Sequence, residues 1–180
     1  MKKVEARDQG KDVTAELTME LIDKRDQKRI RKLKTFRKDG GDVSKSLLFF
    51  LEPADVKGTA FLNWSYSAQK KDDQWLYLPA LRKVKRILAS ENNQSFMGTD
   101  FTYNDLGERK AAEDTHTLLR QESYEGIACY VVRSIPKEAD SPYSQRIVWV
   151  RPDLWLIVRV EFYVRTGALQ KVLRASEIQS

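Results

Sequence analysis

The residues that could do chemistry in this 180-residue chain are few and scattered. The single histidine, His116, has no acidic or cysteine partner at a spacing typical of metal sites or catalytic triads. Asp72 and Asp73 would point in opposite directions on an extended segment, whereas acid–base catalysis needs carboxylates that converge. No serine stands in a Gly-x-Ser-x-Gly turn, and Gly98 and Gly107 are too isolated to form a phosphate-binding loop. The sequence therefore favours a binding protein over an enzyme and predicts no metal and no cofactor.

A second group of candidates is aromatic and apolar, and most of it falls in residues 72–106. Residues 96–103 follow a polar loop and do not alternate as a strand does. Met97 beside Gly98 suits an adaptable contact, because methionine repacks easily and glycine lets the backbone bend. The segment is expected either to plug the core of its own domain or to form the lid or wall of an apolar pocket. The candidate ligand-binding residues are Trp64, Trp75, Tyr77, Phe96, Met97, Phe101 and Tyr103.

The charge of the chain permits anionic partners. Lysine and arginine exceed aspartate and glutamate by 32 to 26, which gives a net charge of +6. Basic runs occupy residues 28–38 and 82–86. Alternating basic residues on a strand usually solvate its outer face or protect a sheet edge. The charge pattern therefore predicts no nucleic-acid partner and favours phospholipid headgroups or peripheral contact with a membrane surface.

Period-2 alternation predicts the elements that must position these residues. A bulge is expected between Ile30 and Leu33, a strand is favoured over a helix at 81–88, and the strand at 44–52 is expected to be buried on both faces. Helix is expected only at 100–106 and 108–114. Strands are predicted at 13–22, 28–38, 44–52, 60–65, 74–78, 81–88, 115–123, 127–135, 145–150, 154–165 and 169–178.

These consecutive strands with short links imply an antiparallel meander. A sheet of roughly ten strands must curl or close. The predicted fold is mostly β with few helices, a single domain over residues 1–180 built on one curved, incompletely closed antiparallel sheet. So little helix leaves the concave face as a cavity or an exposed apolar patch, and both usually indicate binding.

The single cysteine, Cys129, excludes an intramolecular disulfide. It alternates with Ile127 and Val131 on one strand face, which predicts a buried, unreactive thiol. The longest apolar run is far shorter than the roughly 20 residues of a membrane span. No signal peptide is visible after Met1, so the sequence alone indicates either a cytoplasmic protein or one whose signal has been removed.

Nearly the whole chain resembles the LolA-like outer-membrane lipoprotein-sorting proteins. The resemblance is carried, in order and spacing, by LTMELIDKRDQKRIRKLKTFRKD, FFLEPADVKGTAFLNWSY, DDQWLYLPALRKVKRI, SFMGTDFTYNDL, GIACYVV and YSQRIVWVRPDLWLIVRVEFY. It implies an incomplete, half β-barrel whose strongly bent antiparallel sheet has short helices over its open, concave side. The apolar concave face of such proteins holds lipid or acyl chains.

The resemblance also implies a setting. It indicates a periplasmic carrier with its signal peptide removed, a monomer that passes lipid or lipoprotein acyl chains from an inner-membrane transporter to an outer-membrane acceptor. Family members usually have a longer first helix and further strands at the end, so the chain is expected to be shortened at one or both ends. The family's lipoprotein carrier uses an arginine to latch its helices shut, and the sequence assigns no arginine here to that role. The alternatives are a periplasmic sensor or adaptor module that docks on an envelope protein or transporter, and an enzyme of lipid metabolism.

Overall fold

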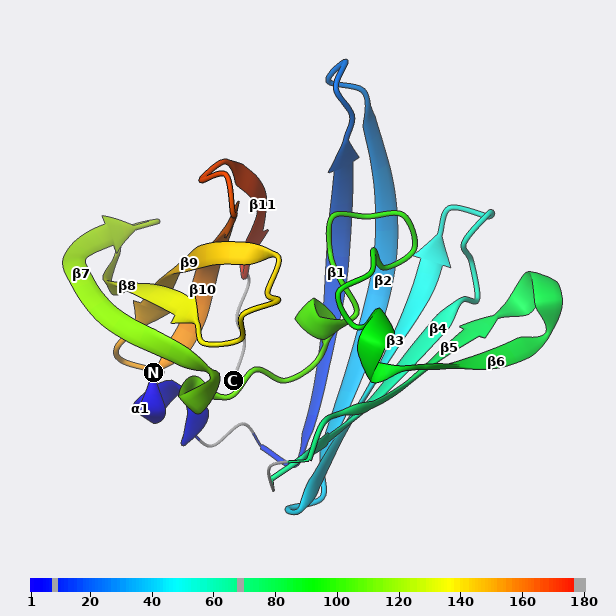
Figure 1. Ribbon diagram of the computed structural model, residues 1–180, viewed down its shortest axis with the longest axis horizontal. Coiled ribbons are helices and arrows are strands. Elements are labelled where there is room, and N and C mark those ends of the chain that lie inside the picture. The colour runs from blue at the N-terminus through cyan, green and yellow to red at the C-terminus, as the bar shows by residue number, and fades with distance from the viewer. Residues whose placement is uncertain (8–9, 68–69, 177–180) are drawn as a thin grey trace. The chain divides into compact units, whose positions relative to one another are not determined.

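The computed structural model describes residues 1–7, 10–67 and 70–176. Within these ranges the chain forms eleven strands in two antiparallel sheets, and its helices are all short (Figure 1). It divides into two compact units. One unit is Gln9–Glu108, and the other combines Met1–Asp8 with Arg109–Ser180.

The unit Gln9–Glu108 is a six-stranded meander, in which every strand pairs with the next along the chain. Short polar turns such as residues 23–27 and 40–42 make these hairpins. The 3₁₀ helices η1 (Pro79–Leu81), η2 (Ala89–Glu91) and η3 (Asn104–Leu106) lie in its later connections. The strands are β1 (Asp12–Ile22), β2 (Lys28–Asp39), β3 (Val43–Glu52), β4 (Ala60–Tyr66), β5 (Asp73–Leu78) and β6 (Lys83–Ile87).

The other unit holds a five-stranded sheet, again with sequential neighbours. The helix α1 (Lys2–Glu5) packs Met1 and Val4 against one core of this unit, and η4 (Ala111–Glu113) precedes its first strand. The strands are β7 (Asp114–Tyr124), β8 (Ile127–Pro136), β9 (Tyr143–Arg151), β10 (Leu156–Val164) and β11 (Leu169–Arg174).

The predicted class is confirmed: the chain is mostly β, antiparallel and poor in helix, and neither sheet closes within the described residues. The strand chosen over a helix at 81–88 is present as β6, and the pairing of β2 with β3 shifts register between Lys32 and Leu33, inside the expected bulge. The last predicted strand ends at Arg174, and residues 177 and 178 of that prediction lie outside the described residues.

Four predictions were wrong. The strands form two sheets because the connection from β6 to β7 is long and irregular, whereas sequential pairing needs a short turn. The strand at 44–52 is buried on one face only, since the side chain of Leu51 is 41% exposed. The helix expected at 100–106 shrinks to the single turn η3, because residues 95–102 close a small hairpin instead, and the helix expected at 108–114 shrinks to the single turn η4 before β7 begins.

Cys129 is buried as predicted, with 1% of its surface exposed. Burial also raises the pKa of its thiol, which lowers the fraction of reactive thiolate at neutral pH. We expect an aromatic disulfide reagent at pH 8 to modify Cys129 at least about a hundredfold more slowly in the native protein than in urea. Equal rates in the two states would show that the site opens freely.

Candidate functional site

The six-stranded sheet has one face that is covered and one that is largely open. We call the covered face the side that carries Leu33, Phe50, Phe61 and Leu76, which belong to one buried apolar cluster. Strand alternation places the neighbours of these residues on the opposite side, which we call the open face. Residues 88–108, drawn in green in Figure 1, cross the covered face.

Within residues 88–108, residues 96–103 enter the core of this unit, and we call them the plug segment. Phe96 has none of its surface exposed, and its ring lies 5.7 Å from that of Phe50 and 5.4 Å from that of Phe61. The ring of Tyr103 packs on Phe61 at 5.8 Å and on Phe96 itself at 5.7 Å. These edge-on and tilted geometries add to the burial of apolar surface, which is large for aromatic side chains. The plug segment therefore occupies the centre of the covered face.

Hydrogen bonds within the plug segment and its flank give it a shape of its own. The Phe96 amide donates to the Phe101 carbonyl at 2.7 Å, and the Ser95 hydroxyl donates to the Thr99 carbonyl at 2.6 Å. Met97 adopts φ of +50° and Gly98 φ of +69°, and the left-handed region is costly for a side chain such as methionine. The small hairpin thus folds on itself, and its apolar side chains fill the sheet's core.

Two polar side chains of the sheet reach the plug segment. Arg31 on β2, only 9% exposed, donates from its guanidinium to the Met97 carbonyl at 2.8 Å. Gln74 on β5 donates from its amide to the Tyr103 carbonyl at 3.1 Å. Burial lowers the pKa of Arg31, and the nearby carboxylate of Asp55 partly offsets this effect. A charge-assisted bond from a buried arginine therefore attaches the plug segment to the sheet.

The structure divides the seven predicted ligand-binding residues between two sides of the sheet. Phe96, Met97, Phe101 and Tyr103 belong to the plug segment over the covered face. Trp64, Trp75 and Tyr77 lie on the open face, because they alternate with the buried Asn63, Gln74 and Leu76. The two groups therefore do not line one pocket.

Arg31 is not among the residues that the sequence pattern predicts for the site. It lies in the basic run that was interpreted as an outward-facing strand. The bulge next to Leu33 and the apolar partner Met19 in the neighbouring strand were the signals that this arginine faces inward.

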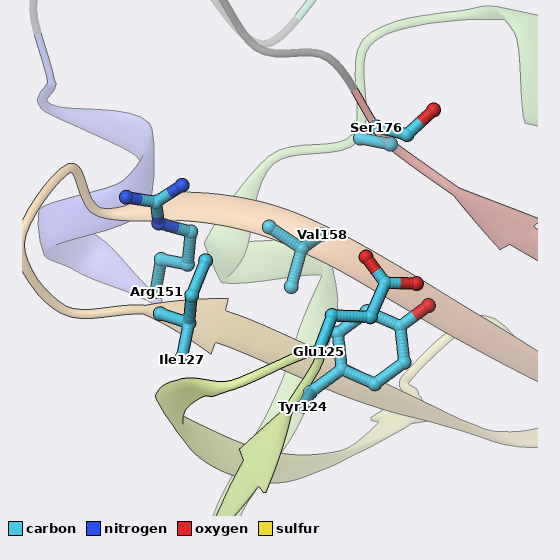
Figure 2. A pocket seen from close by; sticks show the side chains of 7 residues that line it. Tyr124, Glu125, Ile127, Arg151, Val158 and Ser176 are labelled. Atoms are coloured by element: carbon cyan, nitrogen blue, oxygen red, sulfur yellow. The ribbon is translucent and has the colours of Figure 1, made fainter.

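The five-stranded unit has a small cavity that the sequence did not indicate. Its volume is about 110 Å³, well below the several hundred of a typical ligand pocket. Figure 2 shows Arg151 at its side, and this guanidinium is paired with Asp153 at 2.6 Å. The cavity is lined by Tyr124, Glu125, Ile127, Arg151, Val158, Ala175 and Ser176.

His116 has a structural setting at the start of β7. One ring nitrogen lies 2.8 Å from the Ser134 hydroxyl and the other lies 2.9 Å from the Ala111 carbonyl oxygen. Ser134 is 2% exposed, so its hydroxyl does not face a substrate site. Among the described residues, no group of three or more His, Cys, Asp or Glu side chains is arranged to hold a metal ion.

Comparisons with known proteins agree on the type of fold. A family model described only as "Uncharacterized protein" matches residues 42–180. A structure from Vibrio parahaemolyticus, provisionally named an outer-membrane lipoprotein-sorting protein domain, is 36% identical with a TM-score of 0.82. The match covers 99% of this chain and 76% of that one. A DUF1329 family protein from Desulfovibrio piger is 34% identical with a TM-score of 0.73, covering 93% and 71%.

A more distantly related structure has a similar fold. A LolA superfamily protein from Nitrosomonas europaea shares 20% identity and a TM-score of 0.61, over 99% of this chain and 76% of its own. No curated protein matches the sequence. None of the helices in the described residues is both long and apolar enough to cross a bilayer.

Proposed function

Because the chain belongs to the LolA-like outer-membrane lipoprotein-sorting proteins, we propose that it is a non-enzymatic periplasmic carrier that shields acyl chains. The cargo is a lipid or the lipid moiety of a lipoprotein. The donor is an inner-membrane transporter and the acceptor lies at the outer membrane. The carrier acts as a monomer, and both units belong to one LolA-like domain, which the match of 99% of this chain to part of the Vibrio domain supports.

The proposal rests on one observation, that a self-contained hairpin fills the apolar covered face of the six-stranded sheet. Phe96 and Tyr103 occupy the space against Phe50 and Phe61. A segment that keeps its internal hydrogen bonds can withdraw as a unit, and the Met97 and Tyr103 carbonyls, which lose Arg31 and Gln74, then accept hydrogen bonds from water. The face that it leaves is apolar and suits an acyl chain.

The exchange is energetically feasible. Each buried methylene of an acyl chain contributes about 0.8 kcal/mol, so a chain of ten methylenes gains about 8 kcal/mol. Burial of one aromatic side chain is worth about 1.5–3 kcal/mol, so exposing the two plug rings costs less than this gain. An acyl chain can therefore compete with the plug segment without specific polar contacts.

In this account Arg31 holds the closed state. Its bond to the Met97 carbonyl exists only while the plug segment is seated. A ligand must break this bond, and hydrogen bonds to charged groups are worth about 1.5–3 kcal/mol. The attachment therefore lowers the apparent affinity for cargo and favours its release.

We expect an Arg31→Ala variant to bind a fluorescent fatty acid such as cis-parinaric acid about tenfold more tightly than the unmodified protein, because the closed state loses its attachment. Titration of the probe fluorescence measures this affinity. Arg29→Ala is the matched control, because Arg29 is exposed two residues away on the same strand. Absence of probe binding to the unmodified protein would contradict the carrier function. Equal affinity of all three proteins would contradict the role of Arg31.

A further inference from the structure

The open face of the six-stranded sheet carries aromatic, aliphatic and basic side chains in cross-strand rows. In one row, Phe36 of β2 pairs with Leu47 of β3, which pairs with Leu62 of β4 and then with Trp75 of β5. The same row ends on the exposed Arg86 of β6. A neighbouring row runs through Lys34, Phe49, Ala60, Tyr77 and Val84.

Part of this apolar surface is exposed to solvent, and most of the rest is half-buried. The side chain of Phe36 is 42% exposed and that of Val84 is 65% exposed. Trp64 and Trp75 lie between them, half-buried against each other with ring centroids 5.4 Å apart. Contiguous apolar surface of this kind marks a site of interaction.

The open face carries several lysines among fewer carboxylates; Lys34 lies 3.8 Å from the Glu16 carboxylate, and Asp12 stands opposite Lys38. Lys45 Nζ lies 4.1 Å from the centroid of the Trp64 ring, and Lys34 Nζ lies 5.7 Å from that of Phe36. The carboxylate of Asp73 accepts hydrogen bonds from Arg86 at 2.5 Å and Lys70 at 2.9 Å, so two cations compensate its charge. Lys38 and Lys45, adjacent across β2 and β3, are both exposed.

We propose that the open face docks onto the surface of an anionic phospholipid bilayer. Tryptophan, tyrosine and phenylalanine side chains are suited to the level of the headgroups, where one end of the ring is apolar and the other is hydrated. Lysine and arginine beside them pair with phosphate groups and are attracted by the negative surface potential. A bilayer is favoured over single-stranded nucleic acid, because the aliphatic Leu47, Leu62 and Val84 insert into lipid but offer no ring on which bases could stack.

This surface is separate from the one proposed to hold cargo. The plug segment and Arg31 act on the covered face, whereas the membrane contact uses the opposite side of the same strands. A carrier docked in this way holds its cargo face on the side of the sheet away from the bilayer. Each surface can be disabled without altering the other.

The test is flotation of the protein with vesicles of phosphatidylcholine alone and with vesicles of phosphatidylcholine mixed with the anionic phosphatidylglycerol, which adds a negative surface potential. The unmodified protein is expected to float with the anionic vesicles and to remain below with the neutral ones. Lys38→Glu/Lys45→Glu is expected to lower partitioning at least about tenfold, and so is Phe36→Ser/Val84→Ser. All four positions are exposed, so the variants retain the fold, which circular dichroism checks.

Matched controls separate this face from general charge and hydrophobicity. Lys24→Glu/Lys57→Glu reverses two exposed lysines in the turns after β1 and β3, and Val13→Ser/Leu17→Ser removes two apolar side chains of β1, 38% and 39% exposed, on the covered side of the sheet. Both controls are expected to float as the unmodified protein does. Equal flotation with neutral vesicles, unchanged flotation of the open-face variants, or binding to an oligonucleotide without binding to vesicles would overturn the proposal.

Discussion

Replacement of Phe96 by alanine is expected to lower the free energy of unfolding by about 3–5 kcal/mol, the range for truncating a buried phenylalanine. Phe96 has none of its surface exposed and packs on three aromatic rings. The truncation leaves an apolar cavity in the middle of the covered face. Urea unfolding followed by tryptophan fluorescence measures the loss, since Trp64 and Trp75 report on the same sheet.

Phe36→Ala is the matched control, because it removes the same atoms from the open face of the sheet, where Phe36 is 42% exposed. Its cost is expected to be below about 1.5 kcal/mol, less than that of burying a whole apolar side chain. Lauric acid at about a hundred times its dissociation constant is expected to restore about 2.7 kcal/mol to the Phe96→Ala variant. Equal losses in the two variants, or no restoration by lauric acid, would show that the covered face is an ordinary core.

The second large effect is expected at Asp114, in the five-stranded unit. Its buried carboxylate accepts hydrogen bonds from Arg109 at 2.5–3.1 Å and lies 3.5 Å from the guanidinium of Arg146, which is itself buried. Asp114→Ala leaves both guanidinium groups without this carboxylate. Breaking a buried ion pair by removing one partner costs about 3–5 kcal/mol. Thermal and urea unfolding of the variant measure this cost.

Glu113→Gln is the control for the ion pair. Glu113 also pairs with Arg109, at 3.2 Å, but its side chain is 43% exposed. Exposed pairs contribute about 0–1 kcal/mol, so this variant is expected to unfold almost as the unmodified protein does. A stable Asp114→Ala protein would mean that water or another group solvates Arg146 in place of the carboxylate.

The strands could be predicted from the sequence because alternation is a local property. Residues 13–22 and 28–38 alternate clearly, and β1 and β2 begin and end within one residue of those bounds. The break between the two sheets could not be predicted in this way. It depends on where residues 88–113 pass in space, and neither their composition nor their period specifies this path.

Only part of the candidate site can be predicted from the sequence, because alternation is a local property of each strand. Alternation cannot say which face of a strand is covered, so Trp64, Trp75 and Tyr77 were grouped with the plug segment although they lie on the opposite side. The plug segment itself was recognisable because it is apolar and does not alternate. Arg31 cannot be recognised in the sequence, because a buried arginine there cannot be distinguished from its exposed neighbours. Its hydrogen-bond partner is a carbonyl 66 residues away along the chain.

The central claim is that an acyl chain replaces the plug segment on the covered face. Photo-crosslinking with a fatty acid that carries a diazirine in its chain, followed by mass spectrometry that assigns the modified residues, tests this claim most directly. We expect modification of Leu33, Phe50 and Phe61, and its suppression by excess lauric acid. Modification confined to the open face at Trp75 and Tyr77, or to residues 109–176, would contradict it.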